Sequence, residues 1–301
     1  MNIINGTEQY NKSIVLALGF FDCVHVGHLA LINETKKMAS CMNCESAIYT
    51  FCNDPNPFLK KKEQVYTFDD RKIIFDNIHI NNIICDTFSE EFASQSPEEF
   101  IESLISRYDI SGIVVGKDYT FGKKAEGNAV FLKKYLAERK VKVKIMPFER
   151  INSQKISTSH IKKFITDGNV QVANTLLTQP YFMVGEVVHA RHRGTIIGYP
   201  TANIVESENR TKLGAGIYIT KVYIDNRSYL GITNVGPKPT FEEANRSIET
   251  YILDFSKDIY GKTIIVEFYK KIRDVMKFPS VPSLCKQMML DEKEARLFFS
   301  I

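Results

Sequence analysis

The chain has 301 residues, of which 44% are hydrophobic and 25% charged, and its formal net charge is +4. This length favours two domains over one. The small positive charge, the lack of tryptophan and the lack of a basic-aromatic stripe argue against nucleic-acid binding. Residues 1–10 are polar and predict no signal peptide, and no apolar run reaches the roughly 18 residues of a membrane span. We therefore expect a cytoplasmic protein without a nucleic-acid or membrane partner.

The segment Gly19–His28 (GFFDCVHVGH) joins a predicted strand to a predicted helix. The apolar run before it, IVLAL, is typical of a buried parallel strand. Apolar residues then recur at helical spacing from position 26 to about 39, so His25 and His28 share one face where the helix begins. The N–H groups and the positive dipole end of a helix start favour an anion. The segment therefore predicts a nucleotide phosphate site.

Metal binding is the alternative interpretation of these histidines. A metal pair needs a third ligand, and none is obvious nearby. Gly27 lets the backbone approach a ligand closely, which favours the phosphate site. Cys41 and Cys44 form a C-x-x-C pair, but a zinc ribbon needs a second such pair, which is absent. We expect these two to be reduced thiols in a helix-to-strand connection.

Strands and helices alternate in the first half of the chain. Expected strands cover residues 14–18, 46–51, 83–85, 112–115 and 141–147, and expected helices cover residues 26–39, 69–77, 97–105 and 128–140. Such alternation predicts an α/β domain with a doubly wound, Rossmann-like parallel sheet. Its ligands are expected at the carboxyl ends of the strands.

Two further segments follow expected strands, where they can complete such a site. The first, VGKDYTFG, contains Asp118 between two glycines, and these allow a tight turn against a bound ring or phosphate. The second, ISTSHIK, places the hydroxyls of Ser157, Thr158 and Ser159 before a helix and Lys162 one turn on. Hydroxyls at this place form a helix N-cap, and with a cation nearby they also fit a triphosphate.

Strands without long helices between them predict a different fold from Gln179 onward. They are expected at residues 181–189, 199–205, 216–225, 228–235, 247–255 and 263–272, separated by Gly, Asn, Asp and Pro. This succession predicts a small closed antiparallel β-barrel. A helix over residues 281–299 is expected to dock against the barrel.

Polar residues of the predicted barrel form a second candidate site. Thr201 and Asn203 in GYPTAN alternate onto one face of a strand, so their oxygens project together and suit a magnesium ion shared with phosphates. An ordinary polar strand face is the alternative. Glu249 adds a carboxylate in an otherwise apolar strand, and the loop from Asn234 to Thr240 can cover a ring.

These motifs resemble, in order, those of the bacterial riboflavin kinase/FAD synthetase family. HVGH resembles the HxGH signature of the nucleotidyltransferase superfamily, and the flanking GFFD narrows the likeness to that family. VGKDYTFG and ISTSHIK are similar to its G-x-D/N-F-x-F-G and I-S-S-T-x-[IV]-R segments. GYPTAN, NVGPKPT and IETYILDF are similar to its riboflavin kinase module. The likeness extends from about Gly19 to Phe299.

The resemblance implies two ATP-dependent reactions on flavins. Residues 1–179 would be an FMN adenylyltransferase (FAD synthetase) domain that joins FMN to AMP from ATP, and residues 180–301 a riboflavin kinase domain that makes FMN and ADP. The implied ligands are riboflavin, FMN, FAD and ATP, with Mg²⁺ as cofactor. The implied catalytic residues are His25 and His28 at the α-phosphate and Glu249 as base on the ribityl hydroxyl. The implied binding residues are Gly19, Phe21, His25, His28, Ser157, Thr158, Ser159 and Lys162 for nucleotide, Asp118, Asn234 and Thr240 for flavin, and Thr201 and Asn203 for Mg²⁺.

The departures from the family pattern lie mainly in the first half. Cys23 stands where the family usually has glycine, Lys162 where it has arginine, and TFCNDPNP replaces T-F-x-P-H-P. Two alternative functions remain open on these grounds. One is a riboflavin kinase whose N-terminal domain only binds flavin or nucleotide, and the other is a regulatory flavin-binding protein.

Overall fold

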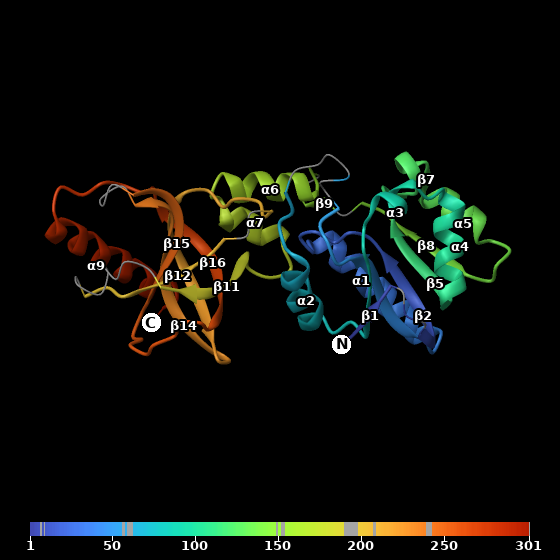
Figure 1. Cartoon of the computed structure of the whole chain (residues 1–301), viewed down its shortest axis with the longest axis horizontal. Helices are drawn as coiled ribbons and strands as arrows, with labels where there is room; N and C mark the ends of the chain where they lie inside the picture. The colour runs from blue at the N-terminus through green and yellow to red at the C-terminus, as the bar shows by residue number, and fades with distance from the viewer. Residues whose placement is uncertain are drawn as a thin grey trace. The chain divides into compact units, whose positions relative to one another are not determined.

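The chain folds into two compact units, Met1–Thr158 and Ser159–Ile301, each with its own sheet (Figure 1). A computed structural model describes residues 1–6, 8, 10–55, 58, 63–148, 150–151, 154–189, 198–206, 209–238 and 243–300. No helix among these residues has the length and apolar character to cross a bilayer. The domain limit expected at residue 179 stays a prediction.

The first unit is built on a six-stranded sheet in which every neighbouring pair runs parallel. Its spatial order is β1 (Asn2–Asn5), β4 (Asn82–Asp86), β3 (Glu45–Phe51), β2 (Tyr10–Leu18), β5 (Tyr108–Gly116) and β8 (Lys142–Met146). From β2 the chain adds β3 and β4 on one side and later β5 and β8 on the other. The topological switch point therefore lies between β2 and β5, where ligands bind in doubly wound sheets.

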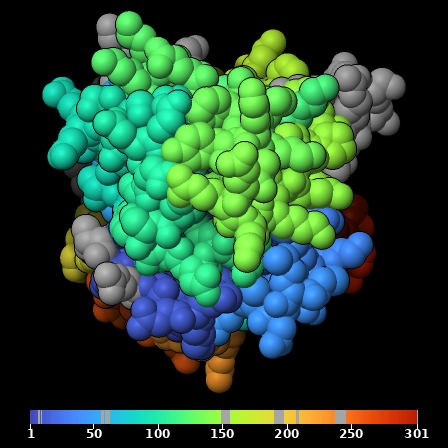
Figure 2. All heavy atoms as spheres, turned by 90° about the vertical axis from the view of Figure 1, so that its right-hand side faces the viewer, coloured from blue at the N-terminus to red at the C-terminus, as the bar shows by residue number. Residues whose placement is uncertain are grey.

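Helices cover both faces of this sheet, as the alternation predicted. One face packs against α1 (Val26–Cys41), which contacts β2, β3 and β5. The approach is close, because a Cβ added to Gly112 of β5 would lie 2.3 Å from the Met38 side chain of α1. The other face packs against α4 (Pro97–Arg107) and α5 (Ala129–Tyr135). The chain around α5 and β8, in green, forms the middle of the face seen in Figure 2.

Smaller elements complete the first unit, and most of them were not among the expected strands and helices. Strand β1 was not predicted, and the helix expected over residues 128–140 ends at Tyr135, because Leu136 is the last apolar residue on its buried face and Lys140 adopts a φ of +59°. The remaining elements are α2 (Phe68–Asn77), α3 (Glu90–Ser94), β6 (Thr120–Phe121), the 3₁₀ turn η1 (Lys123–Ala125), β7 (Gly127–Asn128), β9 (Arg150–Ile151) and β10 (Gln154–Lys155).

The second unit is a closed barrel of antiparallel strands, as predicted. Around the barrel the order is β11 (Phe182–Val188), β12 (Thr201–Ile204), β15 (Glu243–Ile252), β14 (Arg227–Lys238), β13 (Gly216–Ile224) and β16 (Thr263–Arg273). Helices α6 (Thr158–Thr166) and α7 (Val170–Leu176) precede the barrel, and α7 contacts β16. The expected C-terminal helix is α9 (Val281–Phe298), which packs against β14.

Candidate active sites

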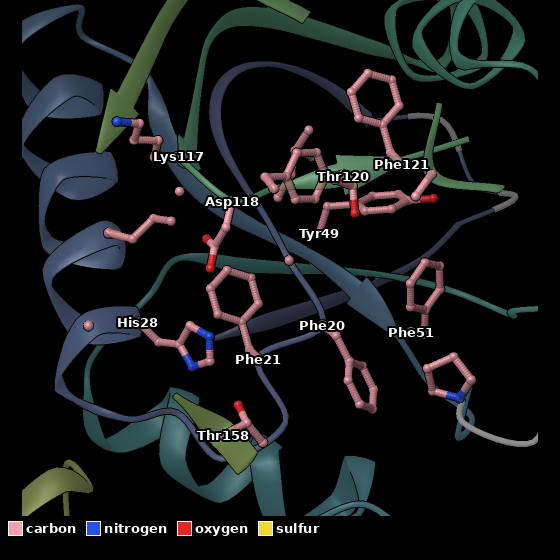
Figure 3. A pocket seen from close by; sticks show the side chains of 18 of the residues that line it. Phe20, Phe21, His28, Tyr49, Phe51, Lys117, Asp118, Thr120, Phe121 and Thr158 are labelled. Atoms are coloured by element: carbon pink, nitrogen blue, oxygen red, sulfur yellow. The ribbon is translucent and has the colours of Figure 1, made fainter. Parts of the chain in front are cut away.

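A cavity of about 660 Å³ lies at the switch point of the parallel sheet (Figure 3). The ends of β2 and β5 border it through Leu18 and Gly116, and the start of α1 borders it through Gly27 and His28. In Figure 3, Phe21, His28 and Thr158 lie on one side of the view, and Tyr49, Phe51 and Phe121 lie on the other. The cavity therefore has a histidine end and an aromatic end.

The two histidines form a stacked pair at the first turn of α1. His25 is the N-cap residue, and its Nδ1 accepts the backbone N–H of His28 at 3.1 Å. The two rings stack with centroids 3.7 Å apart and planes 10° apart. The ring of Phe21 meets His28 edge-on at 5.2 Å. The first intrahelical bond runs from Leu29 N to the His25 carbonyl, so the N–H groups of the first turn before Leu29 stand outside the helical ladder.

Burial keeps both imidazoles neutral near neutral pH. It lowers the pKa of His25 to about 4, although the nearby Asp118 carboxylate opposes the change. Burial and the neighbouring His25 lower the pKa of His28 well below its ordinary value. Because Nδ1 of His25 accepts a hydrogen bond, the neutral ring carries its proton on Nε2. His25 is therefore a hydrogen-bond donor without a positive charge.

We expect the first unit to lose stability as the pH falls from about 6.5 to about 4. The folded pKa of His25 lies below the unfolded value, so the unfolded chain binds a proton in this range that the folded chain does not. For His25 alone this lowers the free energy of unfolding by about 3 kcal/mol. Urea denaturation near pH 7 and near pH 4 measures this difference in the free energy of unfolding.

The matched variant for this measurement is His25→Asn, because asparagine keeps an N-cap acceptor and does not titrate. Between pH 7 and pH 4, the free energy of unfolding should fall by about 3 kcal/mol less in the variant than in the wild-type chain. Equal losses in the two proteins would show that His25 is not the group responsible.

The segment between β2 and α1 is held in unusual backbone conformations. Phe21 and Val24 have φ of +54° and +41° and are buried. Such angles are strained for non-glycine residues and persist only where the surroundings impose them. Asp22 supplies part of this constraint, because its carboxylate accepts the backbone N–H of Val65 at 2.6 Å. The result is a fixed Phe21 ring against His28.

A buried arginine braces the carboxyl ends of β2 and β3. The guanidinium of Arg71, which is fully buried, donates to the Phe20 carbonyl at 2.8 Å, the Phe51 carbonyl at 2.8 Å and the Thr50 hydroxyl at 2.7 Å. It also lies 4.8 Å from the Phe20 ring centroid. Burial lowers the pKa of Arg71 to about 10, which leaves it charged. Arg71 therefore joins the histidine end and the aromatic end through Phe20 and Phe51.

The aromatic end of the cavity is a connected set of rings. Phe51 contacts Phe88 and Phe92 with centroids 5.0 and 5.1 Å apart, and Phe100 contacts Phe92 and Phe121 at 5.8 and 5.4 Å. All five side chains line the cavity. Three of these contacts are edge-to-face and one is tilted, and aromatic surfaces of this kind suit an inserted flat aromatic ligand.

Most of the residues predicted for the first site line this one cavity. They are Gly19, Phe21, His25, His28, Asp118, Ser157 and Thr158. Asp118 points towards the histidine end (Figure 3). Ser159 and Lys162 lie on α6 within the second unit and are not among the lining residues.

Three residues of the second predicted site lie in one row across the barrel. Asn203 of β12 pairs in register with Glu249 of β15, which pairs with Asn234 of β14. Residues in register on adjacent antiparallel strands project on the same face, with Cβ atoms about 5 Å apart. Asn203 is buried, Glu249 and Asn234 are half-buried, and Asn234 Oδ1 is a buried atom without a hydrogen-bond partner among the described residues.

Thr201 lies two residues before Asn203 on the same strand face, as predicted. The side-chain amide of Asn203 donates to the Thr201 carbonyl at 3.3 Å, which leaves Asn203 Oδ1 as an acceptor. Thr240, predicted to contact flavin, lies outside the described residues.

Sequence reasoning missed the aromatic end and the Arg71 brace. Phe88 and Phe92 follow β4 as Phe51 ends β3, and aromatic residues at the ends of adjacent parallel strands were a usable signal. Arg71 had none, because it lies in a helix, FDDRKIIFDN, whose composition resembles a solvated surface.

Two family profiles match the chain in tandem. The profile for FAD synthetase matches residues 7–160, and the profile for riboflavin kinase matches residues 177–299. The first match ends close to the boundary between the two compact units, and the second begins at residue 177, within the second unit.

Proteins similar over the whole chain agree with this pairing. A bifunctional riboflavin kinase/FMN adenylyltransferase of Listeria monocytogenes is 34% identical over 99% of this chain and 96% of its own length. The protein of the same description from Bacillus subtilis is 34% identical over 97% and 94%. A crystal structure from Streptococcus pneumoniae, described as a macrolide-efflux protein, matches with a TM-score of 0.88 and 32% identity over 98% of this chain and 99% of that one.

Proposed function

The chain belongs to the family of bifunctional riboflavin kinases/FMN adenylyltransferases, and we propose that its two sites divide the two reactions between them. The second unit phosphorylates riboflavin with ATP to give FMN and ADP. The first unit transfers AMP from a second ATP to FMN and releases pyrophosphate. The observation that carries this assignment is the cavity of the first unit, in which neutral histidines at a helix start stand beside an aromatic pocket.

FMN and ATP fit opposite ends of that cavity. The isoalloxazine ring is flat and aromatic, and the rings around Phe51 and Phe100 suit it. The α-phosphate of ATP belongs at the histidine end, where the N–H groups and dipole of α1 favour an anion. The FMN phosphate then lies between the two ends, next to the α-phosphate.

Adenylyl transfer needs charge stabilisation more than a protein nucleophile. An oxygen of the FMN phosphate attacks the α-phosphorus, and the bond to the pyrophosphate oxygen breaks. Negative charge grows on the α-phosphate oxygens during this step, and a fixed donor such as the Nε2–H of His25 stabilises it there. His28 packs between His25 and Phe21, so it also holds the donor in place. The Thr158 hydroxyl lines the same end.

Phosphoryl transfer in the second unit is assigned to the row across the barrel. Glu249 accepts the proton of the ribityl hydroxyl as that oxygen attacks the γ-phosphorus of ATP and ADP leaves. Asn234 is placed to hold the flavin, because its buried Oδ1 has no partner among the described residues. The neighbouring Asn203 keeps an oxygen available on the other side of Glu249.

The donor set beside Glu249 fits a magnesium ion. Mg²⁺ takes oxygen ligands, keeps several waters and shares phosphates with its nucleotide. Thr201 supplies a hydroxyl and Asn203 an amide oxygen on one strand face. Asn203 is in register with Glu249, and Thr201 lies one pair further along the same face. A bound ion there would neutralise charge on the β- and γ-phosphates.

Chromatography of the flavins formed by the full chain tests the proposal. One incubation contains riboflavin and MgATP, and a second contains FMN and MgATP. We expect FMN and FAD in the first and FAD in the second. If FMN forms without FAD, the chain is a kinase with an inactive first unit. If neither FMN nor FAD forms, it is a flavin-binding protein. Either result contradicts the proposal.

A further inference from the structure

Cys23 joins the two histidines in one cluster of metal-ligand types. A sulfur or nitrogen from each of Cys23, His25 and His28 lies within 4.8 Å of the others. Cys23 and His25 are buried, at 1% and 8% exposed. The third ligand, which the sequence analysis did not find, is thus two residues before His25 on the same turn into α1.

A second observation at this cluster points to a ligand. Nδ1 of His28 is a buried atom that has no hydrogen-bond partner among the described residues. Buried polar atoms are nearly always paired, and an unpaired imidazole nitrogen is also an available metal ligand. His28 and His25 line the cavity, so water or a small anion can reach a fourth coordination position.

We propose that Cys23, His25 and His28 bind a thiophilic divalent cation, Zn²⁺ in the first instance. One thiolate and two imidazoles are borderline-soft ligands that select Zn²⁺, Co²⁺ or Cd²⁺ over Mg²⁺. Three protein ligands and one open position are the usual arrangement of a zinc site that exchanges its fourth ligand. On binding, the Cys23 thiol gives its proton to solvent and its sulfur forms the metal bond.

The surrounding contacts both assist and oppose binding. The Cys23 thiol donates to the Thr158 hydroxyl at 3.5 Å, and once the thiol has lost its proton the same hydroxyl can donate to the thiolate. Nδ1 of His25, however, accepts the His28 N–H, and the two rings are nearly parallel. Ligation by both rings requires them to tilt apart and His25 to give up either that bond or the Nε2 proton. We therefore expect weaker binding than at a structural zinc site.

A cation held there would occupy the histidine end of the cavity. This consequence, unlike the binding itself, rests on the proposed function: Zn²⁺ should block AMP transfer to FMN while phosphorylation of riboflavin continues. Glycine at position 23, the residue usual in the family, would remove the sulfur ligand. Inhibition of AMP transfer by Zn²⁺ should therefore depend on Cys23.

Co²⁺ added to the metal-free full-length chain tests the binding directly. A thiolate-bound Co²⁺ shows a sulfur-to-metal charge-transfer band in the near ultraviolet, and tetrahedral ligation gives strong visible bands. We expect both in the wild-type chain and in Cys41→Ser, which removes an exposed thiol at the end of α1. In Cys23→Ser we expect Co²⁺ affinity to fall at least about 100-fold, since even outer-shell partners of a metal site contribute 10–100-fold.

Two outcomes overturn the site: no charge-transfer band in the wild-type chain, or the same band at the same Co²⁺ concentration in Cys23→Ser. The second readout is flavin chromatography with added Zn²⁺, where FAD formation should fall in the wild-type chain and in Cys41→Ser more than in Cys23→Ser. Equal inhibition of these three proteins contradicts the site. A wild-type chain that makes no FAD even without Zn²⁺ refutes the proposed function instead, and the Co²⁺ spectrum still decides the metal site.

Discussion

His28→Ala should reduce FAD formation from FMN and ATP by at least about 10²–10³-fold, the usual cost of losing a fixed donor at a developing charge. The substitution removes the ring that stacks on His25 and meets Phe21, so it also releases the donor of His25. The rate of FMN formation from riboflavin should stay within about twofold, because that reaction is assigned to the other unit. Both statements are checked by measuring the rate of FMN formation with riboflavin and MgATP and, separately, the rate of FAD formation with FMN and MgATP.

The control for this experiment is a histidine outside the cavity. His79 is exposed after α2 and has a φ of +55°, which asparagine tolerates, so His79→Asn should leave both reactions unchanged. FAD formation at the wild-type rate in His28→Ala would refute the assignment of the histidine end. A fall in both reactions together would indicate misfolding, and urea denaturation identifies that case.

Glu249→Gln should lower FMN formation by about 10²–10⁴-fold, the range expected for loss of a general base. Glutamine keeps the shape of the side chain and its place between Asn203 and Asn234, but it cannot take the ribityl proton. FAD formation from supplied FMN should be unchanged. The kcat of each reaction at saturating substrate measures the effect.

Glu186→Gln is the matched control, because Glu186 is an exposed carboxylate on β11 of the same barrel. It should phosphorylate riboflavin at the wild-type rate. If a folded Glu249→Gln chain also phosphorylates riboflavin at the wild-type rate, the Glu249 carboxylate is not the base. The row of Asn203, Glu249 and Asn234 would then have a different function.

The sequence predicted the architecture because each half repeats one strong local pattern. Apolar runs such as IVLAL, each followed by an amphipathic helix, indicate a parallel sheet, and β2 with α1 lies where that pattern put them. Strand β1 was missed because NIIN is short and its asparagines look like a polar terminus. It is a strand because it pairs in parallel with β4, a tertiary contact with no local signal.

The same distinction between local patterns and tertiary contacts applies to the candidate sites. His25 and His28 are close in sequence and helical spacing brings them together, so their common position at the start of α1 followed from the pattern. The stacking of the two rings is a finding of the structure. The aromatic end draws Phe51, Phe88 and Phe121 from separate segments, and only the folded sheet brings them to one cavity. Burial also changes the properties of these donors. The sequence predicted histidine donors, and their burial in the fold lowers the pKa of both rings, which favours the neutral form.

Mixing the two inactive variants tests the central claim, that one chain carries two independent sites. With riboflavin and MgATP, His28→Ala alone should stop at FMN, and Glu249→Gln alone should leave riboflavin unchanged. In a mixture of the two, FMN released by the first variant is substrate for the intact first unit of the second. We predict that the mixture forms FAD at a rate near that of Glu249→Gln supplied with FMN. A mixture that accumulates FMN and forms no FAD would contradict two separate, independently working sites.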